Sequence, residues 1–238
     1  MFNTIFYEPL YNLLVVVLQV VPLHDIGAAI IVVTIIIRVL LLPINISAMR
    51  SQYAMKRVEG EMKALREEYA KDAKAASQKM MELYKRENIK PFSSILGILI
   101  QMPILFALFF VFKNGLVANP EHLYSFVSFP EILHTKAFGL IDVTKVSIVF
   151  AFLATVTSYL LAKRQTATMI SNKPAHEETM QDQFMKSMRI QLLYVLPLLV
   201  GGSAIFLPAA LPLYWTVGNL ASIAQDIYIK HTLSTSAV

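Results

Sequence analysis

Long runs of apolar residues alternate with charged blocks along this chain of 238 residues. At 1.5 Å per residue, each run can cross a hydrocarbon core of about 30 Å as a helix, with or without some local thinning. The last two runs come from one apolar stretch, which Pro208 and Pro212 divide into a tight pair. The pattern therefore predicts an all-α, polytopic membrane protein with five transmembrane helices. The five predicted spans cover residues 26–47, 93–112, 146–162, 190–207 and 211–229.

The N-terminal segment, residues 4–22, is predicted to lie on the membrane rather than to cross it. Its apolar part, Leu10 to Val21, contains Asn12 and Gln19, is short for a span and ends at Pro22. An interfacial helix within residues 1–25 is therefore favoured over a sixth span.

The distribution of Lys and Arg predicts the orientation of the spans. Eleven of these residues lie between Arg50 and Lys90 and five between Lys163 and Arg189, against three in residues 113–145 and none in residues 22–25. Basic loops face the cytoplasm. We therefore expect an outer N-terminus and a cytoplasmic C-terminus. The first transmembrane helix is expected at residues 26–50, and spans two to five within residues 91–229. Two loops join those spans, an outer loop at 114–144 and a cytoplasmic loop at 165–186. A short cytoplasmic tail follows at 230–238.

Apolar residues in the first cytoplasmic segment are spaced alternately three and four apart, which is the spacing of a helical packing seam. The pattern restarts after Lys71 and Asp72, so it predicts an antiparallel helical hairpin over residues 51–90. The hairpin is either a solvated connector or a contact surface for anionic lipid or ribosomal RNA, without nucleic-acid sequence specificity. The seam consists of Met55, Val58, Met62, Leu65 and Tyr69 in the first arm and Ala73, Ala76, Met80 and Leu83 in the second.

The amino-acid composition is typical of a membrane protein and excludes several kinds of chemical site. Hydrophobic residues make up 56% of the chain and charged residues 16%, whereas soluble domains carry about 25% charged residues. The absence of cysteine excludes disulfides, thiolate metal sites and cysteine nucleophiles. The first residues lack the basic region of a cleaved secretory signal, so the first span is expected to act as its own targeting signal.

A search for catalytic residues finds no complete set. The segment His176-Glu-Glu-Thr-Met180 begins like a zinc-protease helix, but Met180 stands where the second histidine ligand is needed. Apart from Asp226 near the end of the fifth span, no carboxylate or histidine lies well inside a span, and no phosphate-binding glycine loop is present. We therefore expect no enzyme activity, no metal and no cofactor.

Arg38 is the single charge in the apolar stretch from Ile26 to Ser47. A guanidinium inside such a helix costs from about 3 to more than 10 kcal/mol, depending on how far water reaches it. It stays protonated, because its pKa is above about 12. Its side chain would have to reach roughly 13 Å to leave the membrane near Ser47. A water-filled cavity inside the protein is favoured over a snorkelling or paired structural arginine.

Several uncharged polar residues lie in the spans and are candidates to share that cavity. Thr34 precedes Arg38 by four residues and lies on the same helix face. Each residue taken alone is more typical of a hydrogen bond between packed helices. Together they indicate a hydrated groove whose counter-charge arrives on a substrate. The candidate groove residues are Arg38, Thr34, Gln101, Gln191 and Trp215, with Asn45, Ser47, Thr216 and Asn219 as further polar positions.

An ordered set of motifs resembles the YidC-type membrane protein insertases of bacteria, mitochondria and chloroplasts. The motifs span residues 5–229 in the family's order. They are Thr34-Ile-Ile-Ile-Arg38 with Leu42-Pro43, Lys79-Met-Met-Glu-Leu-Tyr-Lys85, Pro91, Gln101-Met-Pro103, Tyr194-Val-Leu-Pro197 and Leu213-Tyr-Trp-Thr-Val-Gly-Asn219.

The resemblance implies five core helices around a positively charged groove, open to the cytoplasm and the lipid, in a bacterial-type plasma membrane. It implies that Arg38 is the groove arginine, that Thr34, Gln191 and Trp215 line the groove, and that the cytoplasmic hairpin is needed for activity. Two features of many relatives are not found here. These are a large extracytoplasmic domain before the first span and a long basic tail after Lys230, so tail-mediated ribosome docking is not expected.

The function expected from these observations is ATP-independent insertion of small membrane proteins. The expected partners are newly made membrane proteins and lipids, with the ribosome and the Sec translocon as further candidates, and a monomer is expected to suffice. The alternatives are a small-solute or anion transporter that uses Arg38 as its binding cation, and a scaffold that holds partners on the hairpin.

Overall fold

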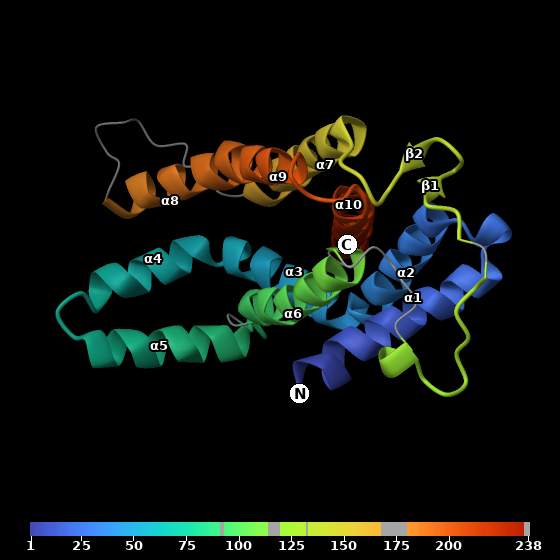
Figure 1. Ribbon diagram of the computed structural model, residues 1–238. Coiled ribbons are helices and arrows are strands. Elements are labelled where there is room, and N and C mark those ends of the chain that lie inside the picture. Colours follow the sequence, from blue (N-terminus) through green and yellow to red (C-terminus); the bar gives the residue numbers. More distant parts are fainter. Residues whose placement is uncertain (91–92, 114–119, 132, 168–179, 236–238) are drawn as a thin grey trace. The chain divides into compact units, whose positions relative to one another are not determined.

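The computed structural model describes residues 1–90, 93–113, 120–131, 133–167 and 180–235 (Figure 1). Helices form most of this chain, which confirms the predicted helical class, with two strands of two residues each as the exception. The remaining residues include parts of the predicted outer loop 114–144, cytoplasmic loop 165–186 and tail 230–238, which therefore lie partly outside the described residues. The chain forms two compact units, Met1–Val39 with Met102–Ala224 and Leu40–Gln101 with Gln225–Val238.

In the first unit, the N-terminal helix is tied to the outer loop by a buried amide. The helix consists of a short π-helical segment, Asn3–Tyr7, and α1, Glu8–Val20. The Asn12 side chain donates to the carbonyl of His122 at 2.8 Å and accepts from the backbone N–H of Tyr124 at 2.8 Å. These contacts satisfy the carbonyl of His122, in a short 3-10 turn at Pro120–His122, and the N–H of Tyr124 just after it, and they hold the turn against α1.

Asp25 joins the start of α2, Ile26–Leu40, to a small antiparallel hairpin of the outer loop. One carboxylate oxygen accepts from the N–H of Ala28 at 2.9 Å, as a helix cap does, and the other accepts from the N–H of Phe138 at 2.6 Å. The hairpin comprises β1, Lys136–Ala137, and β2, Ile141–Asp142.

Gly27 allows this hairpin to approach α2 closely, because a Cβ at Gly27 would lie 2.3 Å from the Cβ of Ala137. Beyond the hairpin, the carbonyls of Val143 and Lys145 accept from the N–H groups of Ala210 and Ala209. The same loop therefore satisfies backbone groups at the starts of two apolar helices.

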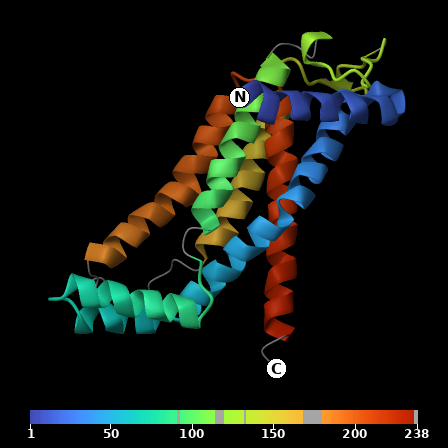
Figure 2. The same cartoon turned by 90° about the horizontal axis from the view of Figure 1, so that it is seen from below.

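A long helical rod in the first unit packs along α7, Ile148–Thr166 (Figure 2). The rod runs without interruption through α8, Met180–Ile190, a π-helical turn at Gln191–Val195, and α9, Leu196–Ala204. A Cβ at Gly201 would lie 2.1 Å from the Thr155 hydroxyl, so this glycine permits the close approach of α9 to α7.

By length and hydropathy, the described helices include fewer spans than the five predicted. Lys186–Ala204 could cross a membrane as one continuous helix, and α2 with α3 could form a second, broken span. Within α6, Ser93–Lys113, the apolar helical segment Leu99–Lys113 is short for a span. The count of five therefore stays a prediction.

The structure interrupts the predicted continuous helix of residues 26–50 at Leu41. α2 ends at Leu40, and α3, Leu42–Arg57, begins directly after the break. Pro43 explains the interruption, because it has no N–H to donate to the carbonyl of Val39 and its ring clashes with that turn. Arg38 consequently lies in the last turn of a helix rather than in the middle of one.

In the second unit, α4, Glu59–Glu68, and α5, Ala73–Arg86, lie antiparallel to each other (Figure 1). Asp72 begins α5 by accepting hydrogen bonds from the N–H groups of Lys74 and Ala75. The core of the hairpin is formed by most of the residues whose spacing predicted a seam, together with Ile89. Its members are Val58, Leu83 and Ile89, with Ala54, Met55, Met62, Leu65, Met80 and Tyr84 packed against them.

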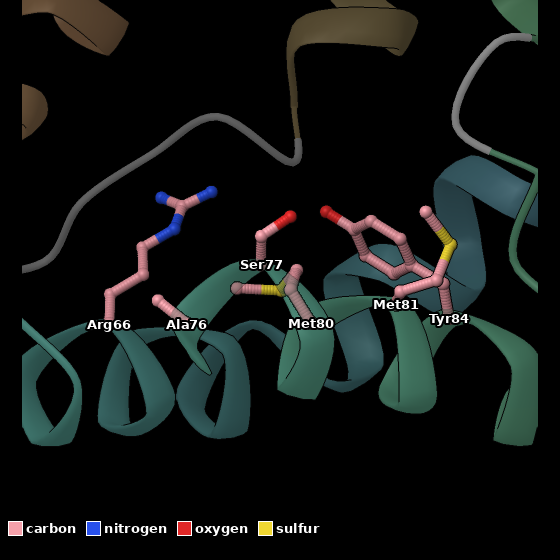
Figure 3. A pocket seen from close by; sticks show the side chains of 6 residues that line it. All are labelled: Arg66, Ala76, Ser77, Met80, Met81 and Tyr84. Atoms are coloured by element: carbon pink, nitrogen blue, oxygen red, sulfur yellow. The ribbon is translucent and has the colours of Figure 1, made fainter. Parts of the chain in front are cut away.

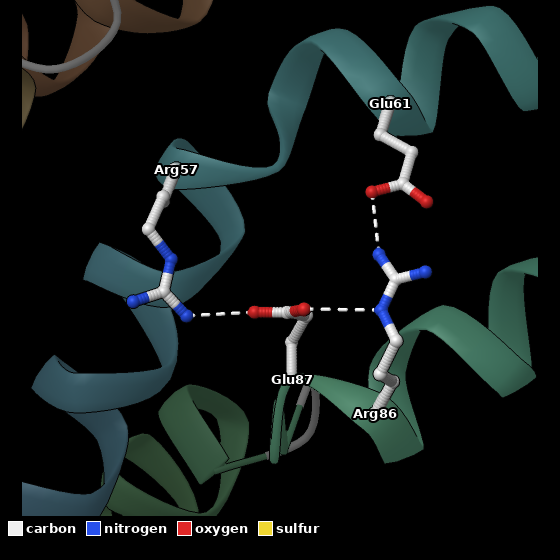
Figure 4. A network of polar contacts seen from close by, with 4 residues as sticks. All are labelled: Arg57, Glu61, Arg86 and Glu87. Carbon is white, nitrogen blue, oxygen red and sulfur yellow. Dashed lines mark hydrogen bonds and ion pairs between the residues drawn. The ribbon is translucent and has the colours of Figure 1, made fainter.

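The open end of the hairpin carries a network of ion pairs around Glu87 (Figure 4). Glu87 accepts from Arg57 at 2.7 Å and from Arg86 at 3.1 Å, and Arg86 also bonds Glu61 at 2.5 Å. The hydrogen bond from Arg57, followed by that from Arg86, holds the pKa of the Glu87 carboxyl below its usual range.

The Glu87 network predicts a pH dependence of the hairpin. Because the pKa of Glu87 is lower in the folded than in the unfolded state, its stabilising contribution is present above the unfolded pKa of about 4.3 and is lost as the pH falls through the folded pKa. We expect the protection factors of the α5 amides, which are exchange rates corrected for the intrinsic effect of pH, to fall over this range in wild type and to change less in Glu87→Gln. The exposed Glu59→Gln variant is the control, and equal pH profiles for wild type and Glu87→Gln would contradict the assignment.

Candidate functional site

The candidate site is built around Arg38 at the C-terminal end of α2. Carbonyl groups in the last turn of a helix have no intrahelical donor and carry partial negative charge. The break at Leu41 therefore gives the guanidinium a favourable helix end, worth about 0.3–1 kcal/mol or somewhat more when partly buried.

One face of α10, Ala210–Thr235, receives the Arg38 guanidinium. Nη1 of Arg38 donates to the hydroxyl of Ser222 at 3.0 Å. One turn earlier, a Cβ at Gly218 would lie 2.5 Å from Nη2 and 3.2 Å from Nε, so the guanidinium lies directly against the helix backbone. A further turn back on the same face of α10 lies buried Tyr214. We call Tyr214, Gly218 and Ser222 the arginine seat.

The guanidinium has no compensating carboxylate within 4.0 Å among the described residues. Its Nε is buried and has no hydrogen-bond partner in the described part of the chain, a property shared with Nε of Arg189. An unpaired charge of this kind is costly in an apolar environment, and it is commonly retained for a functional reason. The seat offers Arg38 neutral partners only, which leaves its charge available to an anion.

A second contact determines which face of α10 is turned toward Arg38. The side-chain amide of Asn219 donates to the hydroxyls of Thr157 at 3.2 Å and Ser158 at 2.9 Å, both on α7. Because Asn219 follows Gly218 directly, this attachment to α7 fixes the rotation of α10 about its own axis. Gly218 and Ser222 are thereby held on the face that meets α2.

The candidate residues taken from sequence are not all brought together. Thr34 is buried on α2, but its hydroxyl donates to the carbonyl of Ile30 within the same helix at 2.6 Å. Trp215 is half-buried on α10 beside Tyr214, and Gln191 is exposed in the π-helical turn. Gln101 belongs to the other compact unit. The groove role of these four residues therefore stays a prediction.

Sequence reasoning missed the arginine seat itself. Its three residues recur every four positions, which places them on one face of a helix. That spacing was visible in the fifth apolar run, but a tyrosine, a glycine and a serine carry no charge to draw attention to them. Only the contact with Arg38 distinguishes them.

Asp226, the carboxylate noted in the fifth apolar run, has its own partners in the second unit. Tyr53 on α3 donates to it at 2.6 Å, and Lys230 lies 3.6 Å away and also stacks over the Tyr53 ring. This buried group therefore ties α3 to the end of α10 within its unit.

A pocket lies on the hairpin and is lined by residues of the second unit (Figure 3). Met80 lies low between Arg66 and Tyr84, while the polar ends of Arg66, Ser77 and Tyr84 point away from the helices. Its lining residues are Arg66, Ala76, Ser77, Met80, Met81 and Tyr84.

An arginine that is held by neutral groups at the end of an apolar helix is typical of a helical integral membrane protein. Comparison with known proteins specifies the family. Residues 17–236 match the family described as 60Kd inner membrane protein.

Curated relatives agree over most of the chain. The membrane protein insertase YidC of Oceanobacillus iheyensis is 30% identical over 232 residues, which cover 96% of this chain and 83% of the relative. YidC 1 of Halalkalibacterium halodurans is 33% identical over 208 residues, or 85% of this chain and 69% of the relative. YidC of Clostridium tetani is 33% identical over 210 residues, which cover 88% of this chain and 83% of the relative.

The chain belongs to the YidC family of membrane protein insertases, which confirms the resemblance seen in the sequence. The family is one of bacterial inner (plasma) membrane proteins, as predicted for this chain, and its members are insertases rather than enzymes.

Proposed function

We propose that the protein inserts small membrane proteins into the bilayer through a hydrated groove that contains Arg38. The observation that carries this proposal is the guanidinium of Arg38, which is held by neutral groups and has no carboxylate partner among the described residues. A short acidic tail of a client protein supplies the missing negative charge. Thr34, Gln101, Gln191 and Trp215 are proposed to line the same groove.

In this mechanism, insertion proceeds without ATP. Transfer of a typical apolar span into lipid is favourable by several kcal/mol, roughly enough to carry a short tail with few charges but not a large domain. Arg38 lowers the barrier for the tail by attraction and by keeping water inside the groove. Burial of the client's apolar helix in lipid then drives release.

The proposed topology has five spans, an outer N-terminus and a cytoplasmic C-terminus, with residues 1–25 at the outer interface. The hairpin of residues 51–90 stands on the cytoplasmic side, where newly made membrane proteins arrive. The ribosome and the Sec translocon are proposed as auxiliary partners, and one copy of the chain is proposed to form a complete groove.

The test is insertion into liposomes that contain only this protein and no nucleotide. The client is a single-span protein with an acidic, translocated N-terminal tail, and protection of that tail from external protease is measured. We expect protection well above that in empty liposomes. Protection no greater than in empty liposomes would refute the proposal, and saturable uptake of small anions by the same liposomes would favour a transporter.

A further inference from the structure

Two tyrosines align α7 with the helical rod. The ring centroids of Tyr159 on α7 and Tyr194 in the π-helical turn lie 6.2 Å apart. The rod ends shortly before Ala209, whose N–H donates to the carbonyl of Lys145, shortly before the start of α7. The two helices are therefore antiparallel, and residues that follow Tyr159 lie at the level of residues that precede Tyr194.

A basic residue lies just beyond each tyrosine at this end of the pair. Lys163 follows Tyr159 by four residues, about 6 Å along the axis, and shares its helix face. Arg189 precedes Tyr194 by five residues, at most about 7.5 Å along the axis. In an uninterrupted α-helix these two side chains would diverge by about 140°. The π-helical turn between them rotates the chain less per residue and brings them closer to one face.

The exposed surfaces of both helices change from apolar to basic at this level. The exposed large apolar side chains described on α7 end at Leu160, and those described on the rod begin at Ile190. The candidate span Lys186–Ala204 begins in the same region. Tyrosines followed by basic residues at the end of an apolar helix are typical of the boundary between hydrocarbon and lipid head groups. We therefore expect head groups at the level of Lys163 and Arg189.

Arg189 has a charge that the described protein groups leave uncompensated. Its Nε is buried and has no hydrogen-bond partner in the described part of the chain, although the residue as a whole is half-buried. No carboxylate of the described residues lies within 4.0 Å of its guanidinium. The hydroxyls of Tyr159 and Tyr194 likewise form no hydrogen bond with the described residues. A cation beside unused donors matches a phosphate, whose oxygens accept hydrogen bonds and carry negative charge.

We propose that Tyr159, Lys163, Arg189 and Tyr194 form a binding site for an anionic phospholipid, which we call the lipid site. The phosphate lies between the basic residues of α7 and the rod, and the acyl chains lie along the exposed apolar surface of the two helices. Figure 2 shows that α8 diverges from α7, so the lipid joins two helix ends that separate here. The lipid site is distinct from the Arg38 site and needs no client protein.

The surroundings of the lipid site favour a phospholipid over a free phosphate ion. A phosphate ion would use the basic groups alone, whereas the apolar surface continues directly from them. Phe152 on α7 and Leu198 on the rod, for example, are 65% and 68% exposed. Two cations favour an anionic head group, because a zwitterionic head group already carries its own positive charge, and basic pockets between membrane helices bind such anionic head groups.

The chain offers matched variants for the lipid site. Arg189→Gln and Lys163→Gln each remove one positive charge and keep a polar side chain. Arg189→Lys keeps the charge and loses the planar group. Lys136→Gln is the control, because it removes the same charge from an exposed position in the outer loop.

The experiment measures phospholipid binding to the full-length protein in detergent by native mass spectrometry. Phosphatidylglycerol and phosphatidylcholine with identical acyl chains are titrated separately. We expect Arg189→Gln to weaken binding of one phosphatidylglycerol by about tenfold and Lys163→Gln by about fivefold, because each removes a charge beside the phosphate. Arg189→Lys should be intermediate, and Lys136→Gln should bind as wild type does. Binding of phosphatidylcholine should be the same in all variants.

Thermal unfolding separates loss of the lipid site from a folding defect. A ligand that binds only the folded state raises the unfolding temperature. Phosphatidylglycerol should therefore stabilise wild type and Lys136→Gln more than Arg189→Gln, while all three should unfold at the same temperature without it. An equal rise in wild type and Arg189→Gln would overturn the proposal.

Competition identifies the occupant. Excess inorganic phosphate should leave phosphatidylglycerol bound, and displacement would show a site for a free anion instead. An acid-tailed single-span peptide should also leave it bound. If that peptide displaces the lipid and its own binding depends on Arg189, the site belongs to the client's path and the lipid proposal is overturned. Equal binding of phosphatidylglycerol by wild type and Arg189→Gln would overturn it as well.

Discussion

Insertion of an acid-tailed client is expected to fall by about tenfold or more when Arg38 is replaced by alanine. A hydrogen bond to a charged group contributes about 1.5–3 kcal/mol, and each 1.4 kcal/mol corresponds to a factor of ten. Arg38→Lys keeps the charge but loses the planar group that lies against Gly218, so we expect intermediate insertion. Protease protection of the client tail in liposomes measures the effect.

This loss should occur without a loss of folding stability. The buried Nε of Arg38 lacks a partner in the described part of the chain, so alanine removes an unsatisfied polar group. This gain offsets the loss of the hydrogen bond to Ser222 and of the interaction with the end of α2. Thermal unfolding of Arg38→Ala in detergent is expected at or above the wild-type temperature. Exposed Arg50→Ala is the matched control and should change neither property. Full insertion by Arg38→Ala would leave the insertase function intact but refute the role of this arginine.

The second large effect is expected at Asp25, where alanine should destabilise the protein by about 2–4 kcal/mol. The change removes the cap of α2 and leaves the N–H of Phe138 without its acceptor, and each loss costs about 1–2 kcal/mol. Thermal unfolding measures the total. Hydrogen exchange should rise selectively in residues 134–143, because this carboxylate holds them to α2.

Asp25→Asn tests the same assignment more finely. Its amide keeps one acceptor oxygen, so one of the two contacts survives and the loss should be about half as large. Glu131→Gln, an exposed change in the same loop, is the control. Unchanged exchange in residues 134–143 of Asp25→Ala would show that the loop is held by other contacts.

Local sequence patterns predicted the helices well where periodicity and turn residues agreed. In the hairpin, the spacing of Met55, Val58, Met62 and Leu65 placed them on one face, and the structure packs them into one core. The break at Leu41 was missed although Pro43 signals it, because the apolar pattern continues through the proline. The hydrophobic pattern indicates which residues leave water, whereas a proline indicates where a backbone hydrogen bond is missing. At Leu41 the missing hydrogen bond ends the helix although the apolar pattern continues.

By itself, the sequence determined that the apolar helices are buried away from water and that one of them carries an arginine. It also determined that no carboxylate lies near this arginine in the chain. These properties follow from composition and from the helical repeat, which are local. The tertiary structure alone decided what Arg38 rests on, because Ser222 lies 184 residues away and becomes its neighbour only through packing. Asn219 turns α10 toward Arg38 through its bonds to α7, and no periodicity within one helix specifies such a rotation.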